Sequence, residues 1–102
     1  MTPEKIVQNS IISYMKSLAE RGYPVYVERR QAGGFSYKMG IPDLYGIVNG
    51  RHIEIEVKRP GGERSSMQIK QQQKFESVGA LYVCADSVDV MKQFMYYNFG
   101  IK

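Results

Sequence analysis

The dipeptide Asn49-Gly50 constrains this chain more than any other feature, because it separates two apolar runs rich in β-forming residues. A two-residue type I′ turn needs positive φ at both central positions, which Asn and Gly tolerate, so the pattern predicts a β-hairpin. If Asn49 and Gly50 form the turn, Val48 pairs with Arg51 and, further along, Asp43 lies opposite Glu56.

This register divides the hairpin into two faces, because side chains alternate along a strand. The apolar face is predicted to join the core and carries Leu44, Val48, Ile53, Ile55 and Val57. The other face carries Asp43, Tyr45, Ile47, His52, Glu54, Glu56 and Lys58. Directly opposed like charges destabilise a sheet, so the acids require a positive group between them. A divalent cation with oxygen ligands would supply it, and Lys58 reaches the same space. The alternative is an exposed, solvated face whose lysine offsets its acids.

The segments Gly40-Ile41-Pro42-Asp43-Leu44 and Glu56-Val57-Lys58 resemble the PD-(D/E)xK nuclease superfamily, and within it the VRR-NUC (virus-type replication-repair nuclease) group. The resemblance covers roughly residues 4–86. It implies a restriction-endonuclease-like α/β core, with a mixed β-sheet flanked by helices. It also implies that Asp43, Glu56 and the Val57 carbonyl hold Mg²⁺ or Mn²⁺, while Lys58 orients or deprotonates a water or steadies developing charge.

Composition places the chain among single soluble domains, residues 1–102, with 43% hydrophobic and 24% charged residues. The net charge of +4 is compatible with a polyanionic partner such as DNA. With one His and one Cys, a protein-only zinc site is excluded, and Cys84 in its apolar run is predicted to be a small buried side chain. Neither a membrane-spanning run nor a signal peptide is recognisable, which predicts a cytoplasmic protein.

The first helix is predicted from Thr2-Pro3-Glu4, a capping residue followed by a proline and an acid, to about Gly22. Counting along its apolar stripe places Glu4 on the core-facing side. The resemblance implies that an acid on this helix completes the metal shell, which Glu4 matches. Glu20 remains open as an alternative, and a purely helix-stabilising role of Glu4 remains open as well.

A basic, glycine-rich loop follows the first predicted strand, residues 24–29, and leads into Asp43. Its charges suit phosphates and its aromatic rings suit an unpaired base, although an ordinary solvated connector has the same composition. The candidate DNA-binding residues of this region and of the later turn are Arg29, Arg30, Phe35, Tyr37, Lys38 and Arg59.

A second helix, capped by Ser65 or Ser66, is predicted to run to about Val78. It carries amides where a core stripe should be apolar, so these must find hydrogen-bond partners or face a polar cavity. The resemblance implies that Gln68 lies beside Lys58. The run 80–85 then predicts a buried parallel strand, and Ser87 predicts a cap for a last helix. The expected order is α-β-β-β-α-β-α.

These features predict a metal-dependent DNA endonuclease without a small-molecule cofactor. The late aromatic and Met surface favours a homodimer, and the resemblance implies dimers that resolve four-way junctions and a phage-like source. Flaps, nicks or duplex DNA are alternative substrates for the same site. A non-catalytic DNA-binding or assembly module is the alternative from another class, and it is disfavoured by the intact Asp43, Glu56 and Lys58.

Overall fold

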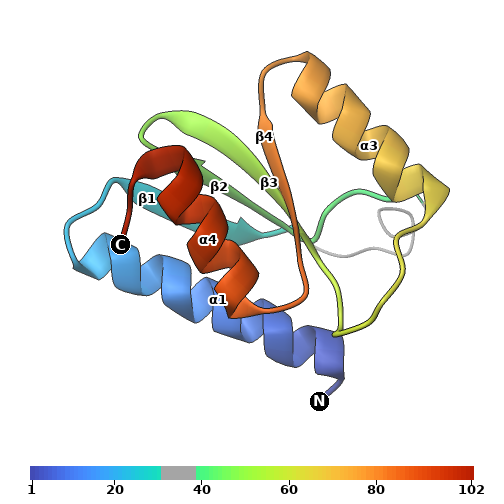
Figure 1. Cartoon of the computed structure of the whole chain (residues 1–102), viewed down its shortest axis with the longest axis horizontal. Helices are drawn as coiled ribbons and strands as arrows, with labels where there is room; N and C mark the ends of the chain where they lie inside the picture. Colours follow the sequence, from blue (N-terminus) through green and yellow to red (C-terminus); the bar gives the residue numbers. More distant parts are fainter. Residues whose placement is uncertain (31–38) are drawn as a thin grey trace.

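The computed structural model describes residues 1–30 and 39–102. It contains a four-stranded sheet in the order β1-β2-β3-β4, made of β1 (Val25–Arg29), β2 (Leu44–Val48), β3 (Arg51–Val57) and β4 (Leu81–Ala85). The helices are α1 (Pro3–Glu20), α3 (Ser66–Ser77) and α4 (Val88–Phe99). In Figure 1, α1 and α4 lie side by side against the sheet, and α3 lies apart from them beyond β4. The predicted order of elements and the mixed sheet are confirmed.

The central hairpin has the predicted register. Val48 pairs with Arg51 and Leu44 with Ile55, and the turn residues Asn49 and Gly50 have φ of 53° and 76°. Positive φ at both positions is the mark of a type I′ turn, whose twist matches that of the flanking strands. The side chains predicted for the apolar face are all buried.

The apolar face of the sheet is covered by α1 and α4. Thr2 caps α1, its hydroxyl oxygen accepting from the Lys5 amide at 3.2 Å, and Pro3 begins the helix as expected. Side chains at helical spacing on α1 and α4 then meet the strands in a single core. Its fully buried helical members are Ile11, Met15, Leu18, Met91 and Met95.

The opposite face of the sheet carries polar side chains. The helix α3 connects β3 to the parallel strand β4 along the chain and packs on this face. Because α3 covers charged and aromatic groups rather than an apolar surface, none of its residues is buried. This is the reason for the amides on its inner side. One of them, Gln71, donates from Nε2 to the Met39 carbonyl at 3.1 Å.

Gly40 brings the segment before β2 into direct contact with the first turn of α3. Its φ is +72°, and a Cβ placed there would lie 2.6 Å from the Met67 carbonyl carbon and 2.7 Å from the Gln68 nitrogen. Both atoms belong to helical backbone and cannot move aside easily. A residue without a side chain is therefore required for the 40–43 segment to reach α3.

In the described part of the chain, no helix has the length and hydrophobicity that a membrane crossing demands.

We predict that Gly40→Ala destabilises the protein by about 3 kcal/mol, because left-handed strain adds to overpacking against the α3 backbone. Gly50→Ala is the matched control. It has a similar φ of +76° with open space around it, and is expected to cost only about 1 kcal/mol. Urea unfolding of both variants measures the difference, and equal losses would contradict the close approach at Gly40.

Candidate active site

Five of the predicted site residues line one small cavity of ≈ 40 Å³. They are Glu4, Asp43, Glu56, Lys58 and Gln68, joined there by residues 40–42. Glu4 comes from the first turn of α1, Asp43 immediately precedes β2, and Glu56 and Lys58 lie at the end of β3. The cavity has room for an ion and a few waters but not for a nucleotide. Glu20, the alternative acid, lies at the other end of α1.

Asp43 has a strongly perturbed carboxyl group. Burial raises its pKa to about 6, and the negative charge of the adjacent Glu4 adds to the rise, while Lys58 and Lys5 oppose it. Two carboxyl groups at such a site tend to share a proton unless a cation replaces it. The pair Glu4 and Asp43 therefore has the electrostatics of a cation site.

Glu56 is buried, 2% exposed, and its carboxylate is held by three donors. Arg64 donates to it at 2.9 Å, the Tyr82 hydroxyl at 2.8 Å and the Cys84 thiol at 3.2 Å. Burial acts to raise the pKa of Glu56, but these three hydrogen bonds outweigh it and lower the pKa. Burial, followed by the hydrogen bond to Glu56, raises the pKa of the Cys84 thiol to about 11.

The donor chemistry of the cavity fits Mg²⁺ or Mn²⁺, which prefer carboxylate and carbonyl oxygens. Within residues 1–30 and 39–102, however, no three acidic, His or Cys side chains are already gathered as a ligand set. Glu4 and Asp43 are adjacent, whereas Glu56 is occupied by Arg64. A metal ion bound by all three would replace Arg64 as the counter-charge of Glu56.

Gln68 lines the cavity from the start of α3, where it forms a capping box with Ser65. Its side-chain Oε1 accepts from the main-chain N–H of Ser65 at 2.8 Å, and the main-chain N–H of Gln68 donates to the Ser65 hydroxyl at 3.1 Å. The cap uses the side-chain oxygen, so the Nε2 amide N–H groups are the donors that Gln68 can offer to a partner in the cavity.

The candidate DNA-binding residues differ in whether their side chains are engaged within the protein or exposed. Arg29 donates to the side chains of Gln8 and Asn9, and Arg30 pairs with Glu54. Arg59 is exposed and lines an open groove of ≈ 290 Å³ that adjoins the small cavity and also includes Lys5. Phe35, Tyr37 and Lys38 lie outside the described residues.

The partners of the two buried glutamates are not predicted from the sequence. Its pattern predicts a positive charge near these acids, but it does not identify Arg30 and His52 as the partners of Glu54 or Arg64 as the partner of Glu56. Cys84, predicted to be a small buried side chain, is only partly buried and also donates to Glu56. Alternation along β4 places Tyr82 and Cys84 on one face of that strand, but it is the parallel register with β3 that brings them to Glu56.

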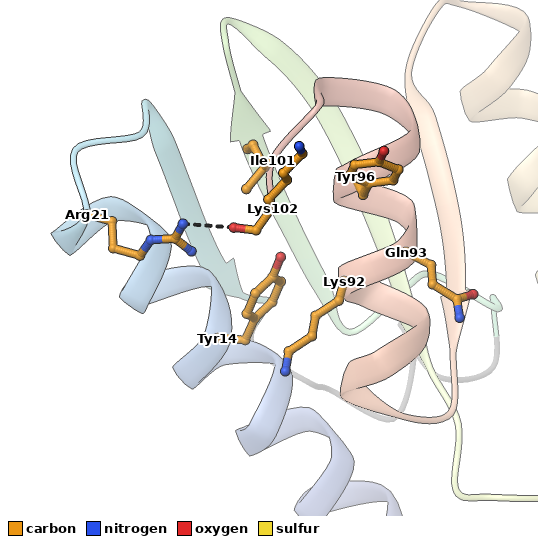
Figure 2. A pocket seen from close by; sticks show the side chains of 7 residues that line it. All are labelled: Tyr14, Arg21, Lys92, Gln93, Tyr96, Ile101 and Lys102. Atoms are coloured by element: carbon orange, nitrogen blue, oxygen red, sulfur yellow. Dashed lines mark hydrogen bonds between the residues drawn. The ribbon is translucent and has the colours of Figure 1, made fainter.

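A larger cavity, of ≈ 470 Å³, lies between α1, α4 and the C-terminal residues (Figure 2). Lys92 reaches from α4 to the Tyr14 ring, with Nζ 5.8 Å from the ring centroid, and Arg21 donates to the Lys102 main-chain oxygen at 2.8 Å. Among the described residues that line it, none is acidic, so it lacks the carboxylates of the small cavity.

Comparisons with known proteins agree with the geometry. A solved structure described as "VRR_NUC domain" superposes with a TM-score of 0.70 at 25% identity, covering 95% of this chain and 99% of that one. A protein of Acyrthosiphon pisum secondary endosymbiont phage 1, named "Putative nuclease p44", is 31% identical over an alignment of 70 residues that covers 62% of this chain and 75% of the phage protein. No family model matches the sequence.

We predict that Glu4→Gln lowers the pKa of Asp43 below 6 in the metal-free protein, because the substitution removes the adjacent negative charge. Glu20→Gln, on the same helix but at its far end, should leave that pKa at about 6. Carboxyl ¹³C chemical shifts followed from pH 3 to pH 8 measure both. An unchanged Asp43 titration in Glu4→Gln would show that the two carboxyl groups do not interact.

Proposed function

This chain belongs to the VRR-NUC family of nucleases, and we propose that it is a Mg²⁺- or Mn²⁺-dependent endonuclease that cuts branched DNA as a homodimer. The observation that carries the proposal is the small cavity, where Glu4, Asp43, Glu56, Lys58 and Gln68 meet from four separate elements and segments. A set of carboxylates with one lysine in one enclosed polar space suits phosphodiester hydrolysis better than DNA binding alone.

Asp43, Glu4 and Glu56, with the Val57 carbonyl, would hold the metal ion. Bound there, it would polarise a phosphate oxygen and lower the pKa of a water. Asp43 must lose its proton to serve as a ligand, so metal binding is favoured above pH 6, where this carboxyl group is ionised. Glu56 would exchange its ion pair with Arg64 for the metal.

Lys58 is the cationic side chain of the cavity, and its charge already acts on Asp43. In this position the ammonium group orients the attacking water or stabilises negative charge as it develops on the phosphate. Gln68 contributes its Nε2 amide N–H donors to the same space and positions the water, while its Oε1 has a second lone pair for Lys58.

Lys5 and Arg59 line the open groove that shares Glu4 and Asp43 with the small cavity. Exposed cations beside a hydrolytic site suit the phosphates that flank the scissile bond, because charge contacts with the backbone position DNA without reading its sequence. We therefore assign the DNA path to this groove.

A binding module without catalysis is the second candidate, and one observation favours it. Arg64 neutralises Glu56, as it would in a protein that never binds a metal. Asp43→Ala separates the two: in a metal-free binder the loss of a carboxylate strengthens DNA binding and nothing else changes. In a nuclease it abolishes cutting while binding persists.

The homodimer is assigned to α4, which presents Tyr96 at 57% and Tyr97 at 88% exposure. Large exposed aromatic side chains on one helix are typical of a protein–protein contact. A two-fold dimer would present two cavities to the two symmetric strands of a four-way junction.

We predict that the protein sediments as a dimer at micromolar concentration and that Tyr97→Ser shifts it toward the monomer, because an aromatic anchor is lost from the contact. Tyr26→Ser, which removes another exposed tyrosine (51%), on strand β1 and not on α4, is the control. A wild type that sediments as a monomer would contradict the dimer.

We predict that Lys58→Ala reduces cleavage at least about 100-fold while DNA affinity stays near that of the wild type, since a group acting on the transition state is removed. Labelled four-way junction, flap, single-stranded and linear duplex DNA with Mg²⁺ or Mn²⁺ are the substrates. Paired symmetric cuts in the junction alone support junction resolution. Cutting of the other DNA forms as well would support a nuclease but contradict its specificity for junctions. If no form is cut in the presence of a metal ion, the binding module is favoured.

A further inference from the structure

Arg30 holds the peptide that joins Pro42 to Asp43. Its backbone amide donates to the Asp43 carbonyl at 2.8 Å, and its guanidinium donates from Nη1 to the Pro42 carbonyl at 2.9 Å. One residue thus binds the carbonyl group of that peptide and the carbonyl group of the next peptide, which lie on the two sides of the Asp43 α-carbon. The contact matters because β2 begins only at Leu44, so the ladder between β2 and β3 does not include Asp43.

The guanidinium is itself fixed in place. Both of its terminal nitrogens donate to the carboxylate of Glu54, Nη2 to Oε2 at 2.6 Å, and Glu54 is completely buried. The Tyr45 and Phe75 rings lie 5.2 Å and 5.8 Å from the guanidinium carbon. Because the guanidinium forms a bidentate ion pair with Glu54 and lies near two aromatic rings, the Arg30 side chain is held in a single orientation.

Glu54 in turn fixes Arg30 relative to the rest of the cavity. It lies two residues before Glu56 on β3, so both side chains point to the same face of the sheet. The chain of contacts from β3 through Glu54 and Arg30 to Pro42 therefore sets the distance between Asp43 and Glu56. Metal ligands need placement to within about 0.5 Å, which a residue outside a strand does not achieve unaided.

We infer that Arg30 and Glu54 are positioning residues for the metal ligand Asp43 and that Arg30 is not a contact to DNA phosphates. The inference rests on the proposed function, and it replaces the sequence-based expectation for Arg30. Only 26% of the Arg30 side chain is exposed, and the donors on its two terminal nitrogens are directed to Glu54 and Pro42.

The test compares Arg30→Gln with Arg29→Gln in the chain of residues 1–102, since both substitutions remove one positive charge at adjacent positions. Mn²⁺ binding is measured by isothermal titration calorimetry without DNA, and junction binding by fluorescence anisotropy in EDTA at several salt concentrations. We expect Arg30→Gln to weaken Mn²⁺ binding at least about tenfold and to leave DNA affinity and its salt dependence unchanged. Arg29→Gln should leave Mn²⁺ binding unchanged.

The opposite pattern overturns the inference. If Arg30 contacts phosphate, Arg30→Gln weakens DNA binding, reduces the salt slope by about one contact and leaves Mn²⁺ binding unchanged. Arg30→Lys, which keeps the charge but not the fork, should weaken Mn²⁺ binding like Arg30→Gln. Recovery of wild-type Mn²⁺ affinity in the lysine variant also overturns it.

Loss of folding is controlled by two further variants. Arg30→Met combined with Glu54→Leu removes the buried charges together, which folds tolerate better than an unpaired carboxylate, and should still weaken Mn²⁺ binding. Met95→Ala makes a cavity in the core under α4 and should lower the melting temperature without changing Mn²⁺ binding. Equal weakening in Met95→Ala would show an effect of stability alone and would overturn the inference.

Failure of the proposed function gives a different result. If the wild type does not bind Mn²⁺, or Asp43→Asn binds it as tightly as the wild type, both the metal site and the positioning role are overturned. If Asp43→Asn loses Mn²⁺ binding but Arg30→Gln does not, only the positioning role is overturned.

Discussion

The burial of two glutamates on one strand is the constraint on which the rest of the structure depends. Glu54 is 0% and Glu56 is 2% exposed, and an isolated carboxylate so far from water costs several kcal/mol. Each is therefore matched by an arginine from outside the strand, Arg30 from the end of β1 and Arg64 from the turn before α3. Among the described residues every buried polar side-chain atom has a hydrogen-bond partner.

These pairs explain the unusual composition of the layer between the sheet and α3. Where a core would normally be aliphatic, a row of four rings lies here, three from the strands and Phe75 from α3: Tyr45, His52, Phe75 and Tyr82, with successive centroids 5.8 to 6.4 Å apart. The aromatic rings cover the two arginine side chains, and the guanidinium groups of these arginines reach the carboxylates. The sheet thus has an ordinary apolar core on one face and a charged, aromatic layer on the other, and the small cavity opens at the end of that second layer.

Features of this structure that depend on neighbouring residues could be predicted from the sequence, whereas features that depend on residues far apart in the chain could not. The hairpin and its register depend on Asn49-Gly50 and on alternation, both of which act locally, so Asp43 and Glu56 could be placed together from the sequence. The parallel register of β3 with β4 depends on how α3 packs, so the contacts of Tyr82 and Cys84 with Glu56 could not. Arg30 and Glu54 are 24 residues apart, and nothing local distinguishes a buried arginine from one that meets phosphate.

The position of Glu4 has a practical consequence for work with this protein. Figure 1 places the two ends of the chain at opposite ends of α1, with the N-terminus at the end that carries Glu4. A polyhistidine tag joined before Met1 would add imidazoles a few residues from the carboxylates, and imidazole is itself a metal ligand. Such a tag would compete for Mn²⁺ and distort any titration. A tag after Lys102 would lie near Arg21 instead, at the far end of the helix.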